Sequence, residues 1–186
     1  MEEQELALKC AQNDRHAREE LYRKYSSRLL AMCLRYEQNV SSAEDILQDA
    51  FIRIFEKIGR FQWQGPGSLY SWMVRLTLNL VFDSKRLRKR LSQYELDDVP
   101  IDYLSVEEPE YEEAASLPPS VLASMITQLP NRYRTVFQLY CIEGLPHREI
   151  GELLGIKEMT SASDLCRAKA LLIKFIKQYW NENGIT

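Results

Sequence analysis

The sequence has few of the residues from which catalytic centres are commonly built. Only two histidines, His16 and His147, occur among the 186 residues. His16 falls in a charged stretch that we expect to be helical. His147 falls at an expected helix start, where a phosphate contact or simple exposure fits better than general-base work. The two histidines therefore form no catalytic set, and we expect no catalytic residue.

Cysteine is also sparse, and no long apolar run occurs. The four cysteines (Cys10, Cys33, Cys141 and Cys166) are far apart, and none forms a CxxC pair. This spacing favours reduced thiols in a cytosolic protein and no metal site. No run reaches the roughly 18 apolar residues of a membrane span, and the first ten residues lack an apolar signal core. We expect a soluble, cytoplasmic protein with no cofactor and no membrane insertion.

The net charge of -3 hides an uneven distribution of charge along the chain. Residues 1–91 carry 16 basic and 12 acidic side chains, residues 92–119 carry 0 and 9, and residues 120–186 carry 8 and 6. The middle stretch also has four prolines and no helical period. We therefore predict an all-α protein in which two small helical domains, 1–91 and 120–186, are joined by a flexible acidic linker, 92–119.

The stretch from Gly67 to Leu91 combines two kinds of helix face. One side is apolar and is expected to be core. The other side carries aromatic, amide and charged groups: Trp72, Arg75, Asn79, Phe82, Asp83, Arg86, Lys89 and Arg90. Aromatic rings between basic side chains suit a nucleic-acid strand with exposed bases. A surface helix with a basic end favoured by the helix dipole explains the same pattern, and the stretch alone leaves both open. The glycines just before it precede no GK[ST] motif, which excludes a phosphate loop.

The helix expected from Ala43, with Ser42 as its cap, has a wide apolar arc and an acidic opposite face. That face carries Asp45, Gln48, Asp49, Ile52 and Glu56, with Phe55 at its border. An isoleucine among carboxylates suggests a protein partner with a basic surface, although a solvated acidic face with one stray apolar residue also fits. A magnesium site at Asp45 and Asp49 is disfavoured because no third acidic residue or phosphate loop supports it.

The last module has the spacing of a helix-turn-helix. Gly151 would let two helices approach closely, Gly155 would supply a left-handed turn residue, and Ile156 would fill the angle between the helices. We expect the helix from about Glu158 onward to enter the major groove of DNA with short residues and one long base on its outer side. The alternative is a plain helical hairpin. We also expect Asn131 to cap the helix that follows it.

Taken together, three segments resemble the extracytoplasmic-function (ECF) sigma factors of bacterial RNA polymerase, within the sigma-70 family. They are AEDILQDAFIRIFEKIGRF (43–61), GSLYSWMVRLTLNLVFDSKRLRKR (67–90) and LPNRYRTVFQLYCIEGLPHREIGELLGIKEMTSASDLCRAKALL (129–172). The resemblance covers nearly the whole chain. It rests on the Asp45, Gln48 and Phe51 arrangement, on the Trp72 and Asn79 helix with its basic end, and on the RAK sequence that ends at Lys169.

The resemblance implies a promoter-specificity subunit that binds core RNA polymerase and opens promoter DNA, without catalysis of its own. The first domain would be region 2 and the last would be region 4. The polymerase-binding surface would be Asp45, Gln48, Asp49, Ile52 and Phe55. The residues that bind the minus-ten element, as duplex and as single strand, would be Trp72, Arg75, Asn79, Ser84, Lys85, Arg86 and Arg88.

The resemblance assigns recognition of the minus-thirty-five element to the last helix, through Thr160, Ala162, Ser163, Cys166, Arg167 and Lys169. The chain departs from the family at Met159, where glycine is common, and at Ala162 and Asp164, where basic residues are common. These departures leave Arg167 as the main cation of that helix. Family members are commonly silenced by an anti-sigma factor, so we expect one here. The alternative function is a stand-alone helix-turn-helix regulator, or an interaction protein, that does not use polymerase.

Overall fold

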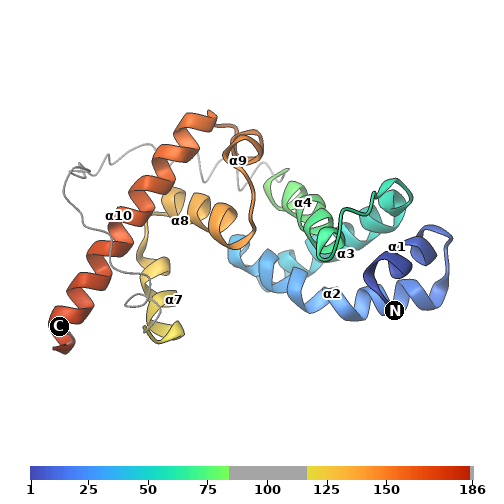
Figure 1. Ribbon diagram of the computed structural model, residues 1–186, viewed down its shortest axis with the longest axis horizontal. Coiled ribbons are helices and arrows are strands. Elements are labelled where there is room, and N and C mark those ends of the chain that lie inside the picture. Colours follow the sequence, from blue (N-terminus) through green and yellow to red (C-terminus); the bar gives the residue numbers. More distant parts are fainter. Residues whose placement is uncertain (84–116, 185–186) are drawn as a thin grey trace. The chain divides into compact units, whose positions relative to one another are not determined.

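Helices form the regular structure throughout the part of the chain that the structure describes. The structure, a computed structural model, describes residues 1–83 and 117–184, and no strand occurs in these two ranges. The chain divides into two compact units, whose described parts are these two ranges. The prediction of an all-helical protein with two helical domains is confirmed (Figure 1).

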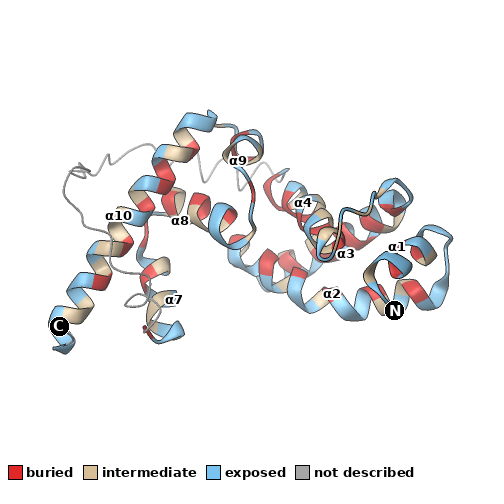
Figure 2. Ribbon diagram, viewed as in Figure 1, coloured by how far each residue is buried: buried red, intermediate tan, exposed pale blue. Residues whose placement is uncertain are grey.

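The first unit begins with four helices and one short 3-10 turn. They are α1 (Glu3–Ala11), α2 (Arg15–Tyr36), α3 (Val40–Lys57), η1 (Ile58–Arg60) and α4 (Ser68–Asp83). α2 packs against both α3 and α4, and α3 also packs against α4. The fully buried side chains between them include Leu21, Leu29, Met32, Ile54, Leu69, Met73 and Leu78. Figure 2 shows buried positions on the sides of these helices that face one another. The apolar arcs predicted for α3 and α4 thus form the core.

The start of α3 differs from the prediction. Asn39, not Ser42, is the cap residue, because the Asn39 side chain accepts a hydrogen bond of 2.9 Å from the Ser42 backbone amide. The helix therefore begins at Val40, three residues before the predicted start at Ala43. Asn and Ser are both good caps, and the sequence offers Asn39 and Ser42 three positions apart. The earlier cap gives the longer helix.

Phe82 was predicted on the polar side of α4, and this was wrong. It is fully buried, and its ring packs edge-on against the Tyr36 ring at a centroid distance of 5.3 Å. α4 packs against both α2 and α3, so its buried face is wider than a helical wheel with one neighbour predicts. The expected apolar side of the stretch to Leu91 also includes Leu87 and Leu91, and these two residues lie outside the described residues.

The second unit consists of α7 (Pro119–Gln128), α8 (Asn131–Phe137), the π-helical turn η2 (Gln138–Ile142), α9 (His147–Leu154) and α10 (Glu158–Asn183). Its core includes Leu117, Met125, Leu129, Tyr133, Ala168, Leu172 and Ile176. Leu117 precedes residue 120, so packing begins upstream of the predicted start of this domain. Asn131 does not cap α8 but is its first residue, because Pro130 before it fixes an extended backbone.

The helix-turn-helix predicted between α9 and α10 is present. A Cβ atom at Gly151 would lie 2.8 Å from the Ile156 carbonyl oxygen, so only glycine permits this approach of the two helices. Gly155 ends α9 with φ of 71°, in the left-handed region that glycine adopts without strain. The side of α10 that faces its own unit, which includes Leu165 and Ala168, is buried. The packing and turn geometry predicted for the helix-turn-helix are therefore confirmed.

Candidate nucleic-acid interface

The outer face of α3 is exposed and acidic. Asp45, Gln48, Asp49 and Ile52 are all exposed, with 57% of Ile52 accessible to solvent, while Phe55 is half-buried. The four polymerase-binding candidates that the sequence placed on one surface therefore lie on one side of the helix, beside Phe55. The structure gives this face an apolar residue in a ring of carboxylate and amide groups. Such a surface suits a partner with basic and apolar groups.

Two residues of α2 contact aromatic rings of α3, and the sequence did not indicate them. The Tyr22 side chain is 46% exposed, and its ring lies 4.6 Å from the Phe51 ring. The Arg18 guanidinium lies over the Phe55 ring, 5.1 Å from its centroid. Both contacts join α2 to α3, so the residue pattern of either helix alone could not reveal them.

A cleft of about 540 Å³ lies at the start of α4. Trp72 and Arg75, both predicted to contact DNA, line it from α4. The remaining lining comes from the loop before the helix and its first residues: Arg60, Phe61, Gln62, Gln64, Pro66, Gly67, Ser68 and Ser71. The rings of Phe61 and Trp72 lie 5.4 Å apart and are inclined by 50°. The cleft thus combines aromatic, amide and cationic groups.

The sequence did not lead us to the loop residues of this cleft, because residues 61–67 were considered for their glycines and not for their side chains. Their composition could have indicated a binding role. Aromatic rings alternate with amides in the order Phe61, Gln62, Trp63 and Gln64. Such groups recur in sites that hold unstacked bases.

Asn79, the third candidate on α4, lies further along the helix and does not line the cleft. Its side chain is exposed and its amide donates a hydrogen bond of 2.9 Å to the Arg75 carbonyl oxygen. The candidates Ser84, Lys85, Arg86 and Arg88 lie outside the described residues. The cleft therefore brings together two of the predicted minus-ten residues.

The outer side of α10 carries the six candidates for the minus-thirty-five element. Ser163, Cys166 and Lys169 are exposed, and Thr160, Ala162 and Arg167 are half-buried. Met159, at the start of the helix, is 79% exposed. Among these six candidates the helix therefore presents small side chains and one exposed base, Lys169, along the surface expected to enter a groove.

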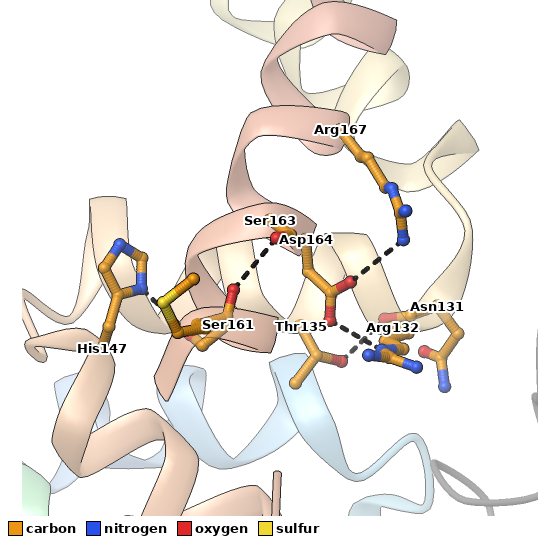
Figure 3. Close-up of polar contacts among 9 residues, drawn as sticks. Asn131, Arg132, Thr135, His147, Ser161, Ser163, Asp164 and Arg167 are labelled. Atoms are coloured by element: carbon orange, nitrogen blue, oxygen red, sulfur yellow. Dashed lines mark hydrogen bonds and ion pairs between the residues drawn. The ribbon is translucent and has the colours of Figure 1, made fainter. Parts of the chain in front are cut away.

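The Asp164 carboxylate explains a departure from the family pattern in this helix (Figure 3). Asp164 is fully buried, and its Oδ2 atom lies 2.6 Å from Nε of Arg132. Its Oδ1 atom lies 3.8 Å from Nη1 of Arg167. The Arg167 guanidinium also lies over the Tyr133 ring, 5.9 Å from its centroid. Asp164 therefore joins α10 to α8 and holds Arg167 against its own domain.

His147 is half-buried, so it is not simply exposed, and the phosphate contact considered from the sequence stays a prediction. Its Nδ1 atom lies 3.0 Å from Ser161 Oγ, and its ring stacks on that of Tyr140 at 4.5 Å. These contacts tie the first turn of α9 to α10 and to η2. The sequence did not indicate this role of His147, because its partners lie on two other helical segments.

Within residues 1–83 and 117–184, no group of three or more metal-ligating side chains could hold a metal ion. None of the helices described in these ranges is long and apolar enough to cross a membrane.

Comparisons with known proteins decide the family. Sigma-70 region 2 matches residues 21–91, and sigma-70 region 4 matches residues 120–172. The ECF RNA polymerase sigma factor SigW of Bacillus subtilis is 32% identical, over 82% of this chain and 85% of its own length. The chain belongs to the ECF sigma factors. SigE of Mycolicibacterium smegmatis, also an ECF RNA polymerase sigma factor, is 32% identical over 89% of this chain and 64% of its own length.

A solved structure has the same fold as this ECF sigma factor. CnrH, in complex with the cytosolic domain of CnrY, aligns with a TM-score of 0.51 and 20% identity over 93% of this chain and 96% of that chain. The region 2 match begins at Leu21, so α1 precedes it. As a sigma factor, the protein is a transcription initiation factor that recognises promoters.

Proposed function

We propose that this sigma factor holds core RNA polymerase through the outer face of α3 and opens promoter DNA at the cleft beside α4. The proposed polymerase contacts are Asp45, Gln48, Asp49, Ile52 and Phe55. The exposed Ile52 supports this role, because an apolar side chain ringed by carboxylates gains from burial only against a partner. Tyr22 and Arg18 would enlarge the contact at its α2 edge.

The observation that carries the proposal is the cleft lined by Trp72 and Arg75. An unpaired base that leaves the duplex stack costs a few kcal/mol, and stacking on an aromatic ring restores about 1–3 kcal/mol. The paired rings of Phe61 and Trp72 offer that stacking, while Arg60 and Arg75 neutralise phosphates. Asn79, Ser84, Lys85, Arg86 and Arg88 would continue the contact along the strand.

The second unit would recognise the minus-thirty-five element with α10. Ser163, Cys166 and Lys169 are the exposed residues of the proposed set, and Thr160, Ala162 and Arg167 flank them. Small side chains allow the helix to approach base edges closely. Because Asp164 holds Arg167, we expect Lys169 to supply more of the phosphate contact than the sequence indicated.

We further propose that the chain catalyses no reaction itself, acts in the bacterial cytoplasm and is restrained by an anti-sigma factor. Polymerase would form the phosphodiester bonds. The proposed partner follows from family membership, and CnrH offers a precedent because it was solved with a cytosolic domain bound.

The polymerase contact is tested by the double substitution Asp45→Ala and Gln48→Ala. We expect co-purification with core polymerase to fall roughly tenfold, because two polar contacts at the centre of the face are together worth about 1.4 kcal/mol. The control is Glu5→Ala with Gln12→Ala, which removes the same groups from exposed positions near α1. Wild-type co-purification by the α3 variant would refute the proposed face.

A further inference from the structure

Glu3, in the first turn of α1, binds the start of α4 although 64 residues separate it from Gly67. Its Oε2 atom accepts a hydrogen bond of 2.6 Å from the Gly67 amide, and its Oε1 atom accepts one of 3.4 Å from the Tyr70 amide. The first amides of a helix have no partner within the helix. A carboxylate at that end also interacts favourably with the helix dipole. Glu3 therefore caps α4 from another helix.

The Tyr25 hydroxyl of α2 holds the same carboxylate in place. It donates to Glu3 Oε1 at 3.3 Å, and the Tyr25 ring stacks on the Tyr70 ring at 5.9 Å. Burial, and then the neighbouring Glu3 carboxylate, raises the pKa of Tyr25 to about 12, so the hydroxyl stays protonated near neutral pH. The Arg28 guanidinium covers the Tyr70 ring, 3.9 Å from its centroid. Three helices thus meet at the residues that begin α4.

α1 also supports the other end of the cleft loop. A cavity of about 110 Å³ is lined on one side by α1 and its end, through Gln4, Ala7, Leu8 and Ala11. Its other side is formed by Ile58, Gly59, Phe61 and Trp63. Phe61 therefore contacts this cavity on one side and the 540 Å³ cleft on the other. Leu8 is 59% exposed at the cavity, so the loop rests on α1 at a loosely packed contact.

We propose that Glu3 is a positioning residue for promoter opening, which sets the shape of the base-binding cleft by fixing Gly67 and Tyr70. The inference rests on the proposed function of the cleft. Gly67 lines the cleft, and Trp72 follows Tyr70 by two residues, so a shift of the α4 start moves the stacking surface. Glu3 lies outside the stretch that matches region 2, and neither the sequence nor the family resemblance assigned it a role.

The experiment compares Glu3→Gln with Glu5→Gln in holoenzyme with core polymerase. Glu5 lies on the same helix and pairs only with Lys9 among the contacts described, at 2.7 Å on an exposed surface. The readout is the base preference of open-complex formation on promoters with a randomised minus-ten element. We expect Glu3→Gln to weaken discrimination at the positions bound by the cleft by roughly three- to tenfold. We expect Glu5→Gln to match the wild type, and core binding to be unchanged in both variants.

A merely structural role for Glu3 predicts a different result. Loss of stability would lower core binding and opening together and would leave the base preference unchanged, which would overturn the inference. A double variant adds a second criterion: with Trp72→Ala present, Glu3→Gln should cause no further change in base preference. Additive losses in the double variant would also overturn it.

Failure of the proposed cleft function is distinguishable from failure of this inference. If Trp72→Ala leaves the base preference unchanged, the cleft does not bind bases. Both the proposed function of the cleft and the proposed role of Glu3 are then wrong. If Trp72→Ala alters the preference but Glu3→Gln does not, only the role of Glu3 is wrong. Should Glu3→Gln not fold, Tyr25→Phe removes the hydroxyl contact and keeps the ring stack. It should shift the same base preferences in the same direction, and an unchanged preference would overturn the inference.

Discussion

Asp164 is the most deeply buried charge of the second unit's helix-turn-helix region. A buried carboxylate is costly unless its partners satisfy it, and the Arg132 guanidinium at 2.6 Å supplies that partner. The pair connects α10 to the first turn of α8, which lies 32 positions earlier in the chain. The relative placement of α8 and α10 therefore depends on one ion pair as well as on apolar packing.

Replacing Asp164 with alanine should destabilise the second unit. Removal of one partner leaves the Arg132 charge partly buried and uncompensated, which costs about 3 kcal/mol of unfolding free energy. Urea denaturation of the full chain, followed by circular dichroism, measures this loss. Asp164→Ala combined with Arg132→Met should recover part of the stability, because no charge is left without a partner. A loss below about 0.5 kcal/mol in the single variant would show that the pair is not structurally important.

Individual residues also show why part of the candidate site could not be predicted from the sequence. The sequence marked Asp164 as a departure from the family pattern, but its partner lies on another helix and no local spacing links the two. Phe82 was placed wrongly because α4 is covered from two sides. Trp72 and Arg75 could be predicted, since an aromatic and a base on one polar helix face are visible in the sequence itself.

At the scale of elements, the corner between α9 and α10 has a strict steric requirement. The Gly151 Cα faces backbone atoms of the turn, and backbone atoms cannot move aside as a flexible side chain can. The orientation of α10, and with it every candidate contact to the minus-thirty-five element, follows from this corner.

Gly151→Ala should therefore lower the stability of the second unit by about 1–3 kcal/mol, because its Cβ would lie 2.8 Å from the Ile156 carbonyl oxygen. The matched control is Gly59→Ala, whose Cβ would meet nothing within 4 Å. Thermal denaturation of both variants measures the difference. Equal transition temperatures would mean that the corner adjusts at little cost.

Helices and their buried faces were largely predictable, because apolar residues recur with a period of about 3.6 in the sequence of each helix. The ends of helices were predicted less well, as Asn39 and Asn131 show, because several residues near each end can serve as a cap. Contacts between elements were not predictable. The Tyr22 and Arg18 addition to the α3 face, and the Glu3 bridge to α4, join segments whose proximity arises only in the folded unit.

At the scale of the whole molecule, the two units carry separate cores and separate proposed tasks. The first unit would combine the polymerase-binding face of α3 with the base-binding cleft of α4, and the second would present α10 to duplex DNA. A substitution in one of these three proposed surfaces should therefore leave binding at the other two unchanged. This separation makes the central claim, that the cleft binds unpaired promoter bases, open to a direct measurement.

The most direct measurement compares core binding with promoter opening for Trp72→Ala, with Trp72→Phe as the control that keeps a stacking ring. We predict that Trp72→Ala binds core polymerase like the wild type but opens duplex promoters at least roughly tenfold more slowly, because one base loses its stacking partner. Trp72→Phe should retain most of the opening rate. Equal losses of core binding and opening in Trp72→Ala would contradict the account and make Trp72 a structural residue of the first unit.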